Sequence, residues 1–270
     1  MEALRAHPAR RRVDARLDPA AGDPAARTPA LERIAAADRR LDWDASLNVR
    51  DLGGLSCGET TILRGRLVRA STIGTLSAAG RDAMRAHGIR TVIDLRGDEE
   101  VAEMPSPYRG GTTYRRMPFT SARIMALHNA AHAGTLPEEL RRIAVPGGGL
   151  AEAVGALAEA EPGIVLHCTA GRDRTGIVIA TVLAAIGVPD EEIVADYVAS
   201  DDDLLEEYAR FKAANPDRAA DVDEGIAKRA WVMGQVLATL REAFGGGVAY
   251  LGLAGVRPAQ LDAIRTKLTA

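Results

Sequence analysis

The 270-residue chain contains only two cysteines, Cys57 and Cys168, and only 4% aromatic residues. Two cysteines are too few for a disulfide framework, and free thiols are typical of a reducing compartment. No stretch approaches the roughly 18 consecutive apolar residues of a membrane-spanning helix. The N-terminal segment also lacks the apolar centre of a signal peptide. We therefore expect a cytoplasmic protein without stable membrane insertion, and export without a signal peptide stays open.

A large excess of one charge is also absent, because the formal net charge is -3 at pH 7. A chain with this balance gives no reason to expect nucleic acid as a partner. The length suits a single domain with an ample core. Residues 1–28 are rich in Ala, Arg, Asp and Pro without a sustained period. This composition predicts a flexible N-terminal arm, followed by one domain at 29–270.

A metal site is a third feature that the sequence does not support. His128 and His132 have the i, i+4 spacing of a metal-binding pair on a helix. No carboxylate or third ligand accompanies them in the pattern that a zinc site requires. We interpret both as solvated helix histidines, and we expect neither a metal nor a cofactor.

One segment does carry chemistry: residues 167–176 read His-Cys-Thr-Ala-Gly-Arg-Asp-Arg-Thr-Gly. A short apolar run at 163–166 precedes it, and a longer one at 177–186 follows it and ends before Gly187 and Pro189. This order predicts a buried strand, a loop and a helix. Because free N–H groups and the dipole at a helix start favour anions, the loop is a candidate phosphate site.

Cys168 and Arg174 are the catalytic candidates in this loop. The loop amides and the Arg174 guanidinium favour the thiolate form of Cys168, which is the nucleophile. Arg174 presents a planar fork that can hold two phosphoryl oxygens as charge develops on them. Thr175 is placed to donate a hydrogen bond to the cysteine sulfur, and His167 to orient the cysteine backbone. The expected phosphate-binding residues are Thr169, Ala170, Gly171, Arg172, Asp173 and Arg174.

The pattern His-Cys-x-x-Gly-x-Asp-Arg-Thr-Gly resembles the active-site loop of the cysteine-dependent tyrosine phosphatase superfamily. Asp173 and the segment 48–54, Asn-Val-Arg-Asp-Leu-Gly-Gly, resemble the bacterial tyrosine/serine phosphatases that also act on phosphoinositides. Segments 64–71 and 91–96 agree in the same order, so the resemblance covers roughly residues 45–265. Arg172 is a departure, since this family usually has lysine there, and the change affects the reach and shape of the pocket.

The resemblance implies a metal-independent phosphatase that hydrolyses phosphomonoesters through a phosphocysteine intermediate. Its substrates would be phosphotyrosine or phosphoserine proteins, with phosphoinositides as a further class. Two alternatives stay open. One is an inositol polyphosphate phosphatase, for which Arg172 beside Arg174 would bind a second phosphate. The other is a phosphate-binding module with little catalysis. The sequence determines neither the physiological substrate nor the oligomeric state.

The general acid is the role that the sequence leaves most open. The chain has no aspartate between Asp98 and Asp173, so the upstream loop aspartate that many tyrosine phosphatases use is missing. Asp94 ends the run 91–93, at the carboxyl edge of an expected parallel strand, where α/β sheets bind ligands. Both equivalent positions line the active site in the resembled family, and we rank Asp94 and Asp173 nearly equal. The remaining candidates are Asp98, Glu99, Glu100, Glu138 and Glu139.

The same charged residues also have structural interpretations. Asp94 can pair with Arg96 or cap the next turn, and Asp173 can hold the loop or Arg50. Arg50 lies on a short turn and can contact substrate, or it can pair with Asp173 or Asp51. We favour a supporting role for Arg50, because paired charges beside an active-site loop commonly orient the groups that touch the ligand.

Alternating apolar and turn patterns predict an α/β fold: a mostly parallel central sheet with helices on both faces, as in tyrosine phosphatases, and a helical C-terminal part. The expected elements are a short helix at 31–41, a helix at 77–87, strands at 91–95, 113–117 and 163–166, a helix at 177–186, and a less regular segment at 118–147.

The chain after the loop reads as helical to its end. Apolar residues at steps of three and four from Ile226 to Phe244 predict one helix of about five turns that docks on the core. The resembled family can cover its pocket with helices that follow the loop, and the stretch from Asp201 to Phe211 is a candidate. We therefore predict a helical lid within residues 200–245.

Overall fold

The computed structural model describes residues 39–108, 113–119, 121–145 and 149–270. The flexible arm expected at 1–28 lies outside these ranges. So does most of the short helix expected at 31–41, and the last three residues of that segment are not helical. No helix in the described ranges is both long enough and apolar enough to cross a membrane.

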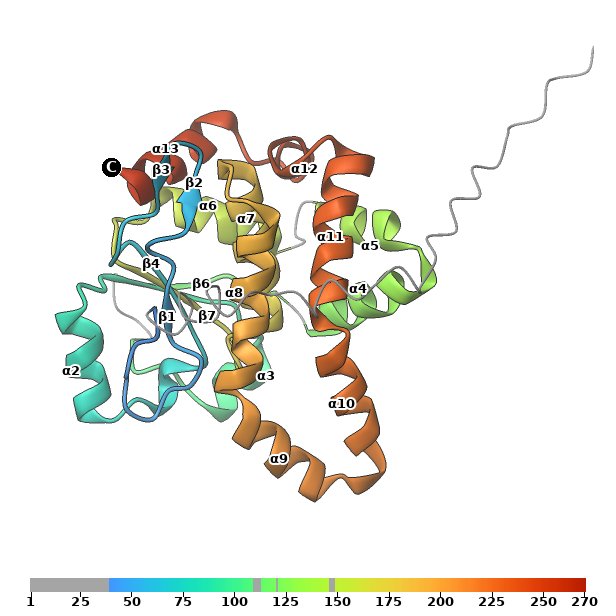
Figure 1. The fold of residues 1–270 in the computed structure, drawn as a ribbon. Coiled ribbons are helices and arrows are strands. Elements are labelled where there is room, and N and C mark those ends of the chain that lie inside the picture. Colours follow the sequence, from blue (N-terminus) through green and yellow to red (C-terminus); the bar gives the residue numbers. More distant parts are fainter. Residues whose placement is uncertain (1–38, 109–112, 120, 146–148) are drawn as a thin grey trace, which may run out of the picture.

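The centre of the fold is a five-stranded sheet with the strand order β1-β4-β7-β5-β6 (Figure 1). Its strands are β1 (Arg50–Asp51), β4 (Leu67–Ala70), β5 (Thr91–Asp94), β6 (Tyr114–Arg116) and β7 (Ile164–His167). All neighbours pair in parallel except β1, which is antiparallel to β4. The prediction of a mostly parallel sheet is therefore confirmed. A separate antiparallel pair consists of β2 (Ser56–Cys57) and β3 (Thr60–Thr61).

Helices make up most of the remaining described chain. Before β7 they are η2 (Ile73–Thr75), α2 (Ala78–Ala86), α3 (Asp98–Glu103), α4 (Ser121–Ala133), α5 (Leu136–Ile143) and α6 (Leu150–Glu159). After β7 they are α7 (Asp173–Ile186), α8 (Asp190–Asp203), α9 (Leu205–Ala214), η3 (Pro216–Arg218), α10 (Ala219–Ala227), α11 (Arg229–Phe244), α12 (Gly247–Leu253) and α13 (Pro258–Thr269).

The central strands are buried on both faces, because their side chains alternate between two apolar layers. Val92 and Val165 belong to one layer together with Met84 of α2. Ile93 and Leu166 belong to the other, larger layer, which contains the buried residues of α6 and α7. Helices therefore cover both faces of the sheet, as the sequence predicts (Figure 1).

The parallel pairing places the catalytic candidates at one edge of the sheet. β5 and β7 run in register, with Asp94 beside His167. Both strands therefore end at the same carboxyl edge, where parallel sheets bind ligands. Cys168 follows β7 directly, and α7 begins at Asp173. The loop between them crosses this edge.

Two expectations about helices are wrong. The segment at 118–147 is not irregular, because it contains α4 and α5; α5 buries Leu136, Leu140 and Ile143 on one face. The single helix expected from Ile226 to Phe244 is divided at Lys228 into α10 and α11. The apolar spacing continues across this break, which is why periodicity alone does not reveal it.

The predicted lid region consists of parts with different packing. Helix α11 buries Val232, Met233, Val236, Leu237 and Leu240 and belongs to the core. Helices α9 and α10 contain no buried residue, and they extend away from the sheet (Figure 1). A lid could therefore involve only the arm formed by α9 and α10, residues 205–227, and its movement stays a prediction.

Candidate active site

Cys168 and Arg174 lie together in the loop that joins β7 to α7. Both side chains are buried, with 3% of Cys168 and 6% of Arg174 exposed. Burial lowers the pKa of Arg174, but the hydrogen bond to Glu100 and the nearby Cys168 sulfur raise it overall. The guanidinium is thus a permanent cation next to the Cys168 thiol.

Gly171 allows the loop to lie against the end of β4. Its φ is +66°, a left-handed conformation that favours glycine. A Cβ atom at this position would lie 2.1 Å from the carbonyl oxygen of Ala70. The glycine of the motif is therefore required by this close approach of two backbones.

Glu100 of α3 forms a pair with the guanidinium group of Arg174. Its carboxylate oxygens accept hydrogen bonds from Nη1 and Nη2 of Arg174, each at 2.6 Å. The hydroxyl group of Thr169 donates to the same carboxylate and accepts from Arg174 Nη2 at 3.0 Å. The hydrogen bonds from Arg174 lower the pKa of Glu100 to about 2. Glu100 is therefore an anion at neutral pH, and it is not a proton donor in this arrangement.

Asp173 is surrounded by donors and cations. Arg172 donates to its carboxylate from Nε at 3.0 Å and from Nη2 at 2.8 Å, and the Tyr197 hydroxyl donates at 3.0 Å. Arg229 Nη1 lies 3.4 Å and His128 Nε2 lies 3.9 Å from Asp173 Oδ1. Burial would raise the pKa of Asp173, but Arg172 and Arg229 lower it well below the usual range. About a quarter of the side chain, 24%, is still exposed.

Asp94 lies at the carboxyl end of β5 beside His167. Its side chain is fully buried and accepts hydrogen bonds from the backbone N–H and the guanidinium of Arg96 and from the Tyr114 hydroxyl. Burial would raise the pKa of Asp94, but the hydrogen bonds from Arg96 lower it overall. The structural interpretation, pairing with Arg96, therefore describes the observed contacts, and His167 Nε2 also lies 3.7 Å from Asp94 Oδ2.

His167 and Thr175, the neighbours of Cys168 and Arg174, are both expected to support the site. His167 Nδ1 lies 3.0 Å from the Cys168 carbonyl oxygen, as expected for a residue that orients the cysteine backbone. Thr175 is fully buried, and its hydroxyl has no hydrogen-bond partner in the described part of the chain. The hydrogen bond expected from Thr175 to the cysteine sulfur is therefore not formed in this structure.

Arg50 supports the site through different partners from those expected. It pairs with Asp196 and Asp203 of α8, not with Asp173 or Asp51. The expectation of a supporting role agrees with these contacts, because the Arg50 side chain is completely buried and reaches no open surface. The expected pairs with Asp173 and Asp51 are wrong, because α8 brings carboxylates closer.

Arg172 belongs to the loop by its backbone, but its side chain is turned toward the helices after it. The guanidinium contacts the Tyr208 hydroxyl of α9 in addition to Asp173, and it lies 5.3 Å from the Tyr208 ring centre. The expected binding of phosphate by Arg172 stays a prediction, because the observed contacts of its side chain are with Asp173 and Tyr208. Arg172 instead joins the loop to the arm at 205–227.

Sequence reasoning missed several residues around Asp173. Tyr197 and Arg229 come from α8 and α11, and their positions follow only from the packing of these helices. The interpretation of His128 as a solvated histidine is wrong, because it is half-buried beside Asp173 and burial lowers its pKa. His132 stacks on the Trp231 ring at 5.0 Å. Within the described residues no cluster of three or more His, Cys, Asp or Glu is suited to a metal ion.

Comparison with known proteins covers most of the chain. The sequence model of a family described as the tyrosine phosphatase family matches residues 41–270. A tyrosine-protein phosphatase of Nostoc commune is 31% identical over 230 aligned residues, which cover 79% of this chain and 77% of the relative. The triple specificity protein phosphatase PtpB of Mycobacterium tuberculosis is 29% identical over 265 aligned residues, with 81% and 95% covered. A putative tyrosine-protein phosphatase of Cupriavidus necator is 30% identical over 180 residues, with 59% and 62% covered.

Proposed function

The chain belongs to the tyrosine phosphatase family, and from that premise we propose that it dephosphorylates phosphotyrosine and phosphoserine proteins through a phosphocysteine intermediate, with phosphoinositides as a further substrate class. The observation that carries the proposal is the buried pair of Cys168 and Arg174 in a loop at a helix start, where Arg174 already holds an anion, the Glu100 carboxylate. Both cysteines are free, which supports a cytoplasmic location.

The proposed reaction has two steps. The Cys168 thiolate attacks phosphorus while Arg174 and the loop N–H groups hold the equatorial oxygens, and the ester oxygen leaves with a proton. Water then attacks the phosphocysteine and gives a proton to the carboxylate that donated one in the first step, and the S–P bond breaks to release phosphate and the thiolate. For the first step, the phosphoryl group must compete with Glu100 for Arg174. Glu100 therefore orders the guanidinium before substrate arrives.

Hydrolysis of para-nitrophenyl phosphate by the purified protein in EDTA tests this proposal. Orthovanadate, which mimics the transferring phosphoryl group, should inhibit the reaction. A panel of phosphotyrosine peptides, phosphoserine peptides and phosphoinositides then ranks the substrate classes. Phosphate binding without turnover of any substrate would support the alternative of a phosphate-binding module, and a preference for soluble inositol polyphosphates would support the other alternative.

We propose Asp173 as the proton donor, because it reaches solvent within the loop, whereas Asp94 is fully buried. A carboxyl whose pKa lies well below the usual range is a poor acid, and Arg172 is the main cause of this lowering. A substrate phosphate that attracts Arg172 removes this effect and lets the pKa of Asp173 rise. Substrate binding thereby prepares the acid.

Asp173→Asn should lower kcat for alkyl phosphates by roughly 100-fold, the usual size of a general-acid contribution, and should change kcat for para-nitrophenyl phosphate much less. The reason is that a leaving oxygen of low pKa needs no proton. In the wild-type protein, activity should fall at high pH as Asp173 loses its proton in the complex. This fall should be weaker in Asp173→Asn, which has no carboxyl group at that position. An alkyl phosphate profile unchanged by Asp173→Asn but altered by Asp94→Asn would reverse this assignment.

We also propose that the arm at 205–227 acts as a lid. Its two helices bury no residue, and Tyr208 connects it to Arg172 of the catalytic loop. Hydrogen exchange should be fast in the arm without ligand and slower by about tenfold with vanadate bound, whereas the strands should be protected in both states. Protection of the arm equal to that of β7, with and without vanadate, would contradict a lid.

A further inference from the structure

The back of the catalytic loop is bonded to a buried polar cluster that no catalytic step uses. We propose that Asn48, Arg69 and Asp196 are positioning residues, which hold the carbonyl groups of the loop and thereby aim its N–H groups at the substrate phosphate. This inference rests on the proposed function, and it adds the groups that give the loop its anion-binding shape.

Four consecutive carbonyl oxygens of the loop accept hydrogen bonds. The pairs are Thr169 O with Thr72 N at 2.9 Å, Ala170 O with Asn48 Nδ2 at 2.9 Å, Gly171 O with Arg69 Nη2 at 2.7 Å, and Arg172 O with Gly176 N at 2.6 Å and Arg69 Nη2 at 3.3 Å. The loop has no cis peptide bond. In a trans peptide the C=O and the following N–H point in opposite directions. Fixing these carbonyls therefore turns the N–H groups of residues 170–173 to the opposite side, toward the position of an anion.

Arg69 holds two of these carbonyls, and Asp196 holds Arg69. Arg69 is 1% exposed, and its Nη1 donates to Asp196 Oδ2 at 2.7 Å while Nη2 reaches the loop. Burial lowers the pKa of Arg69, and Asp196 is the neighbour that opposes this effect most. One planar guanidinium thus joins α8 to the loop, a geometry that the single ammonium of lysine cannot reproduce.

Asn48 is oriented by the same cluster. Arg50 Nη1 donates to Asn48 Oδ1 at 2.6 Å, so the amide nitrogen of Asn48 is the end that faces Ala170 O. Arg50 in turn donates from Nε to Asp196 Oδ1 at 3.4 Å and from Nη2 to the Asp196 carbonyl oxygen at 2.6 Å. Asn48 and Arg69 are the two side chains that bond carbonyl groups of the loop, and the contacts that hold both of them lead to Asp196.

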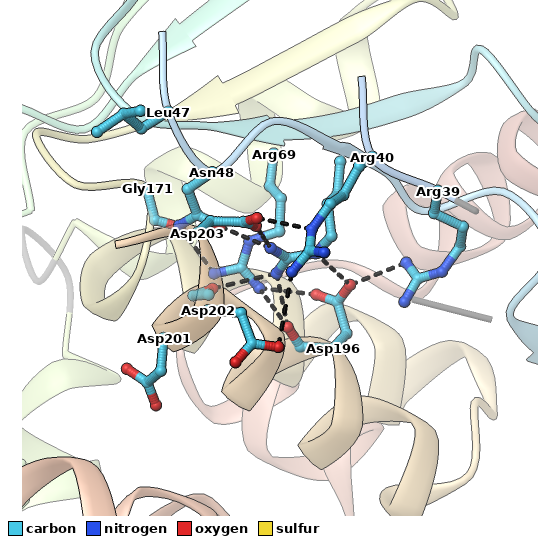
Figure 2. Close-up of polar contacts among 12 residues, drawn as sticks. Arg39, Arg40, Leu47, Asn48, Arg69, Gly171, Asp196, Asp201, Asp202 and Asp203 are labelled. Carbon is cyan, nitrogen blue, oxygen red and sulfur yellow. Dashed lines mark hydrogen bonds and ion pairs between the residues drawn. The ribbon is translucent and has the colours of Figure 1, made fainter. Parts of the chain in front are cut away.

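Asp196 is the shared counterion of the cluster. Figure 2 shows its carboxylate among the arginine side chains, with Arg39 on one side and Arg69 on the other. Its side chain is 2% exposed, and Arg39, Arg50 and Arg69 all pair with it. Burial would raise the pKa of Asp196, but these three arginines lower it well below the usual range. The carboxylate therefore stays charged and keeps the guanidinium groups in one arrangement.

The test compares variants of the cluster with a buried carboxylate elsewhere. Asn48→Asp keeps an oxygen acceptor for Arg50 but removes the donor to Ala170 O. Arg69→Lys keeps the charge but cannot join Asp196 to Gly171. The control is Asp51→Asn, because Asp51 is also fully buried, and its carboxylate bonds the N–H groups of Gly53 and Gly65 and the His87 ring but, among the described residues, makes no hydrogen bond to the loop. The readouts are the inhibition constant of vanadate, kcat and KM for para-nitrophenyl phosphate, and the thermal midpoint.

We expect the inhibition constant of vanadate to rise by about tenfold in Asn48→Asp and by about 100-fold in Arg69→Lys. Asp51→Asn should lower the thermal midpoint but leave the inhibition constant within about twofold of wild type, so loss of stability alone does not produce the effect. Asp196→Asn should resemble Arg69→Lys if it folds, and the other two variants decide the question if it does not.

Folded Asn48→Asp and Arg69→Lys proteins with wild-type vanadate inhibition would overturn the inference, and so would an equal change in Asp51→Asn. These outcomes leave the proposed function intact, because the wild-type protein would still be an active, vanadate-sensitive phosphatase. A wild-type protein without turnover or vanadate sensitivity would instead overturn the proposed function itself.

Discussion

Cys168→Ser is expected to abolish turnover of phosphomonoesters, with kcat lower by roughly 10⁴-fold or more, as for other catalytic nucleophiles. A serine hydroxyl beside Arg174 is not ionised at neutral pH, so the phosphorus is not attacked. The residues that hold the phosphate are unchanged, and isothermal titration should still detect binding of inorganic phosphate. Rapid-quench measurements should trap a phosphoenzyme in the wild-type protein and none in the variant.

Cys57→Ser is the matched control for this experiment. Cys57 is also buried, and its sulfur donates to the carbonyl oxygen of Ile186 at 3.2 Å, at the end of α7 distant from the loop. Serine can keep this hydrogen bond, so kcat and KM should stay within about twofold of wild type. Activity that survives Cys168→Ser, or disappears in Cys57→Ser with the fold intact, would contradict the assignment of the nucleophile.

Arg174→Lys is expected to have the second-largest effect, a fall in kcat/KM of about 1,000-fold. The guanidinium binds both oxygens of Glu100, at 2.6 Å each, which shows that it can hold two oxygens of one anion. An ammonium group is a point charge and cannot form this fork, although it keeps the net charge. The loss should therefore appear mainly in kcat, because the charge of the phosphoryl group is most spread out in the transition state.

Arg172→Lys is the appropriate comparison, because it makes the same chemical change two residues earlier in the loop. The contacts of the Arg172 side chain are with Asp173 and Tyr208, whereas those of Arg174 are with Glu100 and Thr169. We expect a loss of less than about tenfold in kcat/KM for para-nitrophenyl phosphate. Equal losses in the two variants would show that charge alone, and not the fork of Arg174, is needed.

The local features of the site could be predicted from the sequence. The strand, loop and helix around Cys168 follow from two apolar runs and the motif between them, since each signal spans fewer than about 20 residues. The parallel sheet follows in the same way from alternating elements. Asp94 and Asp173 are acid candidates because of their places at the strand edge and in the loop, with support from the resemblance. The structure shows them in different surroundings: Asp173 is partly exposed, whereas Asp94 is buried.

Contacts between distant segments could not be predicted. Asp196 looks like any other acidic residue of a helix that also contains Asp190, Glu191 and Glu192. Only the packing of α8 shows that Asp196 is buried among arginines from the N-terminal half of the domain. The surroundings of His128 could not be predicted for the same reason, since its neighbour Asp173 comes from another helix. A single sequence has no periodicity that reports such pairs.

The cluster behind the loop also bears on when the site forms during protein synthesis. Asn48 and Arg69 precede the catalytic motif in the chain, but Asp196 follows it. A nascent chain that has emerged only as far as α7 carries Cys168 and Arg174 without the carboxylate that holds Arg69 in place. A proteolytic fragment that ends there has the same deficiency. On the proposal made above, the loop takes its anion-binding shape only after α8 has packed against α7 and brought Asp196 to Arg69, late in synthesis.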